Sequence, residues 1–391
     1  MKGAHEVHAT RCGTYEPDVL RNHIRDHLGR YPGYGDLKGK RVLLKPNLLS
    51  AVEPEAGVTT HPEFLKQVII ELQDRGASCV IGDSPGGAFT RPVLKRAYEM
   101  SGFSRVAEET GASLNYNTSS RKVRWEKGRF TKVFEISEYI LDADTIISLP
   151  KLKTHMLTGL TCATKNMFGA VPGTTKVTYH TRFPEPVEFC KMLHDLAYAT
   201  GLGLSIVDGI IGMEGSGPRR GEPREVGLIA SGTHPEVLDL FLARAVGLDP
   251  ERLPMLKAAG ELDMIDLRQE IRITGDGADF GLDPPFKPAG GWFLISNPPR
   301  ALRRMVVSAS TRKPLILTHR CVGCGVCAKN CAGDAITLKG GKAVIDYGKC
   351  IRCYCCHELC PHGSVSLTRS ISPIGRAISR SATLLVDKII R

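Results

Sequence analysis

The feature that most constrains this chain is a cysteine pattern that occurs twice. Residues 321–331 read CVGCGVCAKNC and residues 350–360 read CIRCYCCHELC, so both follow the spacing C-x2-C-x2-C-x3-C, with Cys350 equivalent to Cys321. Nine of the thirteen cysteines fall in this segment, and such clustering favours metal ligation over a disulfide framework. Cys355 has no counterpart in the first copy, where Val326 stands, so we do not expect it to bind metal.

The spacing predicts two [4Fe-4S] clusters, each of which is bound by three cysteines of one half of the repeat and one cysteine of the other half. Three cysteines separated by two residues sit on a tight loop and can hold three corners of one cubane. We expect the fourth cysteine to begin a helix that points away, so that it ligates the other cluster. Zinc is the alternative, but zinc sites usually pair two C-x2-C units. The predicted ligand sets are Cys321, Cys324, Cys327 and Cys360 for one cluster, and Cys350, Cys353, Cys356 and Cys331 for the other.

This segment, about residues 315–370, resembles the bacterial two-cluster ferredoxin domain. The resemblance rests on the eight cysteines in register and on the internal repeat. The proline that follows the fourth cysteine is present as Pro361 but is replaced by Ala332 in the first half. The resemblance implies transfer of single electrons, and hence an external donor or acceptor protein.

The first 300 residues alternate apolar strands with helical stretches, which is typical of an α/β fold with a mostly parallel sheet. Apolar spacings of three and four residues predict helices in HPEFLKQVIIELQDRG and EFCKMLHDLAYATG. Four predicted strands end in polar residues: RVLLKPN, CVIGDSPGG, TIISLPKLKTH and LSIVDGIIGMEG. Because ligands bind beyond the carboxyl ends of strands in open α/β sheets, we expect these four ends to meet at one cleft.

The predicted cleft is rich in lysine, which favours an anionic small molecule such as a carboxylate or a phosphate. We expect Lys45, Lys151 and Lys153 to surround the anion with Asp83 facing them. The predicted catalytic residues are Asp83, Lys151 and His155, with Asp83 or His155 moving a proton. The remaining predicted substrate contacts are Asn47, Lys165 and Asp208. The alternative is that the lysines are solvated and the aspartates cap helices.

Residues 158–173, TGLTCATKNMFGAVPG, are predicted to form a short helix and a Gly/Pro loop that can close over a ligand. The segment of about residues 5–300 resembles the domain-of-unknown-function 362 family. The resemblance rests on KPN, GDSPGG, PKLKTH, TKNMFGAVPG and VDGIIGMEG. That family often occurs fused to a two-cluster ferredoxin domain, but it brings no established reaction. It leaves open whether a flavin or another cofactor is present.

The predicted organisation has four parts: an α/β domain (1–299), a basic linker (300–314), a small α+β ferredoxin-like domain (315–370) and a helical tail (371–391). The net charge of +11 originates in the last quarter, where residues 300–391 hold 16 basic and 4 acidic side chains. The tail is predicted to be a basic amphipathic helix that lies on a membrane or in a partner groove. Packing on the ferredoxin-like domain is the alternative.

Three sequence features would indicate a membrane, secretion or a nucleic acid. A membrane-spanning helix needs an apolar run of roughly 20 residues, and no run in this chain comes near that length, so we expect no transmembrane helix. The N-terminal segment has no apolar signal sequence, which favours a reducing cytoplasm, with peripheral membrane contact through the tail. No recognised nucleic-acid fold occurs, so no specific nucleic acid is expected.

Three functions remain open on the sequence alone. The first is an oxidoreductase in which electrons pass through the clusters to or from an anionic substrate in the cleft. The second is a non-enzymatic electron carrier whose α/β domain docks a redox partner. The third is a binding or assembly protein in which the clusters are structural or sensing elements.

Overall fold

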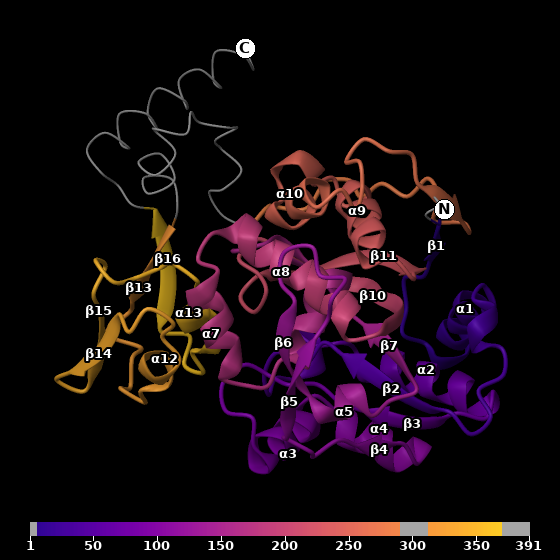
Figure 1. Cartoon of the computed structure of the whole chain (residues 1–391), viewed down its shortest axis with the longest axis horizontal. Helices are drawn as coiled ribbons and strands as arrows, with labels where there is room; N and C mark the ends of the chain where they lie inside the picture. The colour runs from indigo at the N-terminus through magenta and orange to yellow at the C-terminus, as the bar shows by residue number, and fades with distance from the viewer. Residues whose placement is uncertain (1–5, 290–311, 370–391) are drawn as a thin grey trace. The chain divides into compact units, whose positions relative to one another are not determined.

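The computed structural model describes residues 6–289 and 312–369. The chain divides into two compact units, with the boundary between Pro288 and Ala289 (Figure 1). The predicted tail, 371–391, lies outside the described residues, and so does the predicted linker as far as residue 311. Described structure resumes at Arg312, shortly before the predicted start of the second domain.

A ten-stranded sheet forms the centre of the first unit. Its strands are β1 (Glu6–Arg11), β2 (Arg41–Pro46), β3 (Ser78–Ile81), β4 (Ser113–Leu114), β7 (Thr145–Leu149), β8 (Lys151–His155), β9 (Gly159–Thr161), β10 (Leu202–Glu214), β11 (Glu222–Gly232) and β12 (Arg272–Thr274). The order is β12-β1-β11-β10-β7-β2-β3-β4, with β8 pairing β10 and β9 pairing β8. A separate hairpin consists of β5 (Ser120–Arg124) and β6 (Val133–Ser137).

Most strand pairs in this sheet are parallel, which confirms the predicted fold class. The pairs β2–β3, β2–β7, β3–β4, β7–β10, β8–β10 and β1–β12 are parallel. The pairs β1–β11, β10–β11 and β8–β9 are antiparallel. Strand β2 is buried along nearly its whole length, as expected for a strand covered on both faces.

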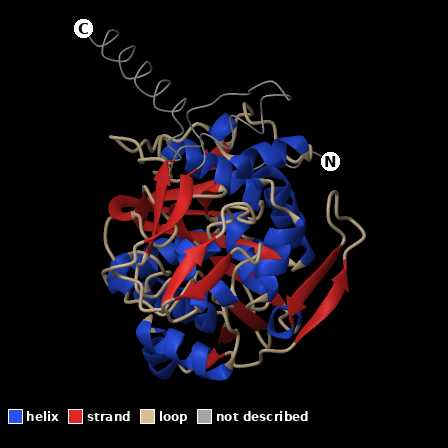
Figure 2. Cartoon of the chain, turned by 90° about the vertical axis from the view of Figure 1, so that its left-hand side faces the viewer, coloured by secondary structure: helices blue, strands red, loops and turns tan. Residues whose placement is uncertain are grey.

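Helices pack on this sheet, as the blue and red elements of Figure 2 show. They are α1 (Pro17–Gly29), α2 (Pro62–Asp74), α3 (Arg91–Met100), α4 (Phe103–Thr110), α5 (Glu138–Leu141), α6 (Ala163–Asn166), α7 (Thr175–Arg182), α8 (Pro186–Ala199), α9 (Pro235–Ala245) and α10 (Pro254–Glu261). Short 3-10 turns are η1 (Pro32–Tyr34), η2 (Pro54–Ala56), η3 (Met167–Ala170) and η4 (Pro250–Arg252). The two helices predicted from apolar spacing are confirmed as α2 and α8. No helix among the described residues is long and apolar enough to cross a membrane.

Two predicted elements differ in the structure. The stretch TIISLPKLKTH forms two strands, because Pro150 has no N–H to donate to a sheet ladder. Strand β7 then pairs with β2, whereas β8 pairs with β10 and β9. Residues 158–173, predicted as a helix and a loop, begin with β9 before α6 and η3 follow.

The second unit is small and its elements repeat. They are β13 (Arg312–Ile316), α12 (Val326–Lys329), β14 (Ile336–Lys339), β15 (Lys342–Ile345), α13 (Cys355–Leu359) and β16 (Val365–Arg369). Two antiparallel pairs, β13–β16 and β14–β15, flank the helices. Cysteines and apolar side chains share the core, which includes Cys321, Ile336, Ala343, Cys356 and Val365.

The backbone of this unit repeats as closely as its cysteines do. Three left-handed residues in the first half have left-handed partners at the equivalent positions of the second half: Gly323 (φ 69°) and Arg352 (56°), Gly325 (75°) and Tyr354 (63°), Asp334 (46°) and Gly363 (63°). Arginine and tyrosine rarely adopt this conformation. The loop geometry is therefore repeated even where the second half has no glycine.

Candidate functional site

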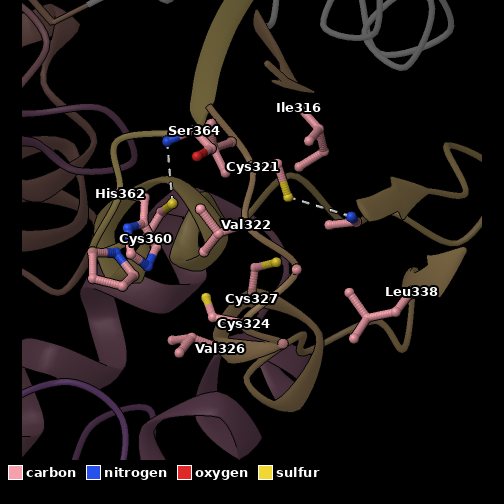
Figure 3. A pocket seen from close by; sticks show the side chains of 15 residues that line it. Ile316, Cys321, Val322, Cys324, Val326, Cys327, Leu338, Cys360, His362 and Ser364 are labelled. Atoms are coloured by element: carbon pink, nitrogen blue, oxygen red, sulfur yellow. Dashed lines mark hydrogen bonds between the residues drawn. The ribbon is translucent and has the colours of Figure 1, made fainter. Parts of the chain in front are cut away.

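A cavity in the second unit is lined by four cysteines, Cys321, Cys324, Cys327 and Cys360 (Figure 3). The first three come from the loop before α12 and from α12 itself, whereas Cys360 follows α13. A second cavity is lined by Cys331, Cys350, Cys353 and Cys356, together with Cys355.

The eight predicted ligands thus divide between the cavities in the two sets that the spacing predicts. The expected position of the fourth cysteine was wrong in detail. Helices α12 and α13 each contain the third cysteine and end before the fourth, so Cys331 and Cys360 follow a helix and do not begin one. The two helices pack against each other, which lets the chain beyond each helix reach the other cavity.

Backbone N–H groups point at several of these sulfurs. Ala335 donates to Cys331 Sγ and Ser364 donates to Cys360 Sγ, both at 3.2 Å and both from four residues beyond the cysteine. Ala343 donates to Cys321 Sγ at 3.5 Å, and this bond is the main reason that the pKa of Cys321 is lowered. Such donors stabilise negative charge on a ligating sulfur.

The donor set fits an iron–sulfur cluster. Four thiols around a largely apolar cavity are what a [4Fe-4S] cluster requires, and Cys321, Cys327, Cys356 and Cys360 are buried. In the described part of the chain, no three His, Cys, Asp or Glu side chains are grouped to hold a single metal ion. Cys331, Cys350 and Cys353 are half-buried, and Cys324 is exposed.

In the first unit, two of the predicted lysines are paired with carboxylates. Lys45 at the end of β2 is fully buried, and its Nζ lies 2.7 Å from Asp83 Oδ1, beyond the end of β3. Asp83 Oδ2 also accepts from the N–H of Leu48 at 2.8 Å. Burial lowers the pKa of Lys45, and the Asp83 charge opposes that effect.

Lys151 forms a second pair on β8. Its Nζ lies 2.8 Å from Asp208 Oδ2 and donates to the hydroxyl of Tyr15 at 2.8 Å. The Tyr15 hydroxyl donates to Asp208 Oδ1 at 2.7 Å. Burial lowers the pKa of Lys151, with Asp208 opposing, whereas burial and the Asp208 charge both raise the pKa of Tyr15.

Amide side chains connect the Lys153 region to Lys45. Lys153 Nζ donates to Asn47 Oδ1 at 2.7 Å and to the Val58 carbonyl at 2.6 Å. Asn47 Nδ2 donates to Asn166 Oδ1 at 3.0 Å, and Asn166 Nδ2 donates to the Lys45 carbonyl at 3.2 Å. All these groups are therefore positioned by protein contacts within one polar network.

His155 is buried at the end of β8. Its Nδ1 accepts the N–H groups of Leu157 and Thr158 at 3.0 and 3.3 Å, so a neutral His155 carries its proton on Nε2.

Two further lysines lie near the Lys45–Asp83 pair. Lys176 on α7 donates to the carbonyl and the hydroxyl of Ser84, each at 2.9 Å, and to the Val171 carbonyl at 2.6 Å. Burial lowers its pKa to about 7; Asp83 opposes this shift, while Lys45 and Lys165 add to it. Lys165 and Lys176 are only partly buried, so solvent reaches both.

The predicted arrangement in which Asp83 faces three lysines does not match this geometry. Asp83 pairs with Lys45, and Asp208 pairs with Lys151. The substrate-binding and proton-transfer roles of the predicted residues stay predictions. Sequence reasoning missed Tyr15, Ser84 and Lys176; the only signal for Ser84 was its place in DSPGG, and the other two had none.

Comparisons with known proteins agree with these two units. Residues 42–244 match the family described as a domain of unknown function (DUF362), and residues 313–361 match a 4Fe-4S dicluster domain. Fold and cysteines define an α/β protein joined to a ferredoxin-type iron–sulfur module for electron transfer. The chain belongs to the DUF362 family.

Two curated proteins are similar in sequence. A thylakoid-associated protein of Synechocystis sp. is 33% identical over 274 residues, covering 68% of this chain and 82% of that protein. A ferredoxin-like protein from the nif region of Sinorhizobium fredii is 40% identical over 52 residues, covering 12% of this chain and 81% of that protein.

Two solved structures show a weaker likeness. The lactate racemase apoprotein of Thermoanaerobacterium thermosaccharolyticum has 13% identity and a TM-score of 0.41, and the match covers 63% of this chain and 57% of that one. A Thermotoga maritima protein has 12% identity and a TM-score of 0.34, with half of each chain covered. At these scores we infer nothing from either.

Proposed function

We propose that this chain is an oxidoreductase that passes single electrons through two [4Fe-4S] clusters, to or from an anionic substrate held in the α/β unit. One observation carries the proposal: the eight cysteines line two cavities, each with three cysteines from one half of the repeat and one from the other. That division supports a content of eight iron and eight sulfide per chain.

An external donor or acceptor protein exchanges electrons with the clusters in this proposal. Support comes from Cys324, which is exposed while Cys321, Cys327 and Cys360 of the same cavity are buried. The first cluster would therefore approach the surface of its unit at Cys324. The bound cluster supplies one-electron chemistry, and the protein supplies the docking surface around it.

The anionic substrate is proposed to contact Lys165 and Lys176. Both side chains lie near the buried Lys45–Asp83 pair, where several positive charges gather. A bound anion interacts favourably with these positive charges. Because its pKa is near 7, Lys176 can take up or release a proton at neutral pH, and it joins Asp83 and His155 as a candidate for proton transfer.

Lys151, Lys153, Asn47 and Asp208 are proposed to hold the substrate-facing strand ends in place. Each makes hydrogen bonds to neighbouring strands or loops. Peripheral membrane contact through the basic tail is a further part of the proposal. It is supported by the tail sequence and by the name of the thylakoid-associated relative. The free cysteines of the described residues suit a reducing compartment such as the cytoplasm.

Anaerobic reconstitution followed by anion binding tests the proposal. We expect about eight iron per chain. Phosphate or a small carboxylate should stabilise the α/β unit by about 2.7 kcal/mol at a hundred times its dissociation constant. Lys176→Ala should lose this stabilisation and keep its iron, whereas Lys127→Ala, which changes an exposed lysine, should keep both. Zinc in place of iron, or four iron per chain, would remove the two-cluster part.

An electron carrier without a substrate is the second candidate. It is favoured by the ion pairs of Lys45 and Lys151, which already balance two of the buried charges. Single-turnover measurements separate the two candidates: the reduced chain is mixed with a panel of small carboxylates and phosphate esters, and cluster absorbance is followed. Reoxidation that Lys176→Ala slows supports the oxidoreductase. Reoxidation by acceptor proteins alone supports the carrier.

A further inference from the structure

The second cysteine cavity contains one thiol more than a cluster needs. Cys355 is buried and lines the cavity beside Cys353 and Cys356, which places its thiol within reach of the Cys353 sulfur. The pattern C-x2-C-x2-C-x3-C does not include it, and its place in the ligand set is taken by Cys356. A fifth sulfur therefore lies against a predicted ligand without being one.

The internal repeat supplies the comparison for this residue. Val326 occupies the equivalent position in the first half, lines the first cavity and is the first residue of α12, just as Cys355 is the first residue of α13 (Figure 3). The two cavities thus differ at one matched backbone position by a thiol in place of an apolar side chain.

We propose that the Cys355 thiol donates a hydrogen bond to the iron-ligating sulfur of Cys353 and thereby raises the reduction potential of the second cluster. The proposal rests on the two-cluster function proposed above. A ligating sulfur has no proton, so in the bond between these two sulfurs Cys355 must be the donor. Reduction adds one electron to the cluster, and a donor to a ligand sulfur stabilises the added negative charge. The proton stays on Cys355.

The backbone donors in this unit do not reproduce the difference that Cys355 makes between the two cavities. The N–H groups of Ala335 and Ser364 donate to Cys331 and Cys360 at equivalent positions, so they serve both cavities alike. The Ala343 N–H acts on Cys321 in the first cavity. The comparison that isolates Cys355 is therefore between the second cluster with and without this thiol, and not between the two clusters.

The test exchanges the matched residues in the full-length chain. Wild type, Cys355→Val, Cys355→Ser and Val326→Cys are reconstituted anaerobically, their iron is counted, and both cluster midpoints are measured by electron paramagnetic resonance during reductive titration. Cys355→Val should keep eight iron and shift one midpoint to a more negative potential while the other stays. Cys355→Ser retains a donor and should shift less. Val326→Cys should shift the other midpoint to a more positive potential. Cys356→Ser, which removes a predicted ligand, should lose iron.

Two results would overturn the proposal. If both midpoints of Cys355→Val equal those of wild type, the thiol does not tune the cluster. If Cys355→Val loses iron, Cys355 is a ligand. Neither result contradicts the proposed two-cluster function. That function is contradicted by a different result, a wild-type chain that holds fewer than eight iron.

Discussion

Lys45, Lys151 and Lys176 of the α/β unit are each held by a different set of acceptors, and these influence how firmly each lysine keeps its proton. Lys45 and Lys151 contact carboxylates, which favour the charged form. Lys176 donates to neutral oxygens of Ser84 and Val171, so burial acts on its pKa with less opposition. The three lysines therefore differ in whether a carboxylate or a neutral oxygen accepts their hydrogen bonds.

The pKa of Lys176 predicts a pH dependence of stability. Between pH 7 and about 10.5 the unfolded chain holds a proton on this side chain that the folded chain has released. The contribution of Lys176 to the free energy of unfolding should therefore rise with pH across that window and be flat below it. With solvent screening, we expect a rise of about 2 kcal/mol that is absent in Lys176→Met. Chemical denaturation of both chains at several pH values measures it, and parallel curves would contradict it.

Gly169 in η3 gives a second prediction at this scale. A Cβ atom at this residue would overlap Asp83 Oδ1 and Lys45 Nζ. Gly169→Ala should therefore break a buried ion pair and destabilise the first unit by about 3 kcal/mol. Gly29→Ala is the control, because nothing lies within 4 Å of its Cβ position at the end of α1. Denaturation midpoints compare the two. Equal stability of both variants would mean that the pair tolerates displacement.

The cysteine sets were predictable and the lysine partners were not, for a physical reason. Ligation by cysteines in one short segment depends on spacing along the chain. The partner of a buried lysine depends on which strands are neighbours: β2 lies beside β3, which brings Lys45 to Asp83, and β8 pairs with β10 at Lys151 and Asp208. Strand order is set by packing over the whole sheet. Tyr15 reaches Asp208 from 193 residues away along the chain.

Among the elements, the two cysteine loops show how one backbone is specified by different residues. The first loop uses glycines for its left-handed positions, and the second uses Arg352 and Tyr354. Left-handed backbone costs a non-glycine residue about 1 kcal/mol. In the second loop the buried Tyr354 side chain helps to hold this conformation, because its hydroxyl donates to the Arg312 carbonyl at 3.0 Å.

A third prediction concerns the first of these loops. Gly323 has φ 69°, and a Cβ atom there would overlap the carbonyl oxygen of Gly341. Gly323→Ala should displace the loop from the turn before β15 and lower the iron content. Gly340→Ala is matched to it, because Gly340 also has a positive φ (55°) but open space around its Cβ position. That control should cost only about 1 kcal/mol and keep its iron. Iron loss in both variants would assign the effect to backbone strain alone.

Sequence patterns predicted elements well where one local rule applied. Helices α2 and α8 follow from the periodicity of their buried residues. The break between β7 and β8 at Pro150 was also readable, since proline cannot donate to a ladder, but the apolar run around it favoured one continuous strand. The strand β9 could not be predicted, because three residues are too few to show a period and their partner strand β8 is known only from the fold.

For the whole molecule, the excess of positive charge in the last quarter predicts how the chain meets other surfaces. Deleting residues 371–391 should leave iron content and folding unchanged and abolish binding to vesicles that contain anionic lipid. Wild-type binding should weaken with added salt, because the Debye length is about 10 Å at 0.1 M. Co-sedimentation with the vesicles at several salt concentrations measures this. Loss of iron on deletion would instead assign the tail to packing on the ferredoxin-like unit.

The pairing of β13 with β16 fixes where the chain joins this unit. Arg312 is the register partner of Arg369, so the first and last described residues of the unit are neighbours across one ladder. The basic segments before residue 312 and after residue 369 therefore start from one edge, although both cysteine loops lie between them along the chain. An anionic surface that binds one of these two segments therefore also lies close to the start of the other. Both segments can then contact that surface without a rotation of the unit.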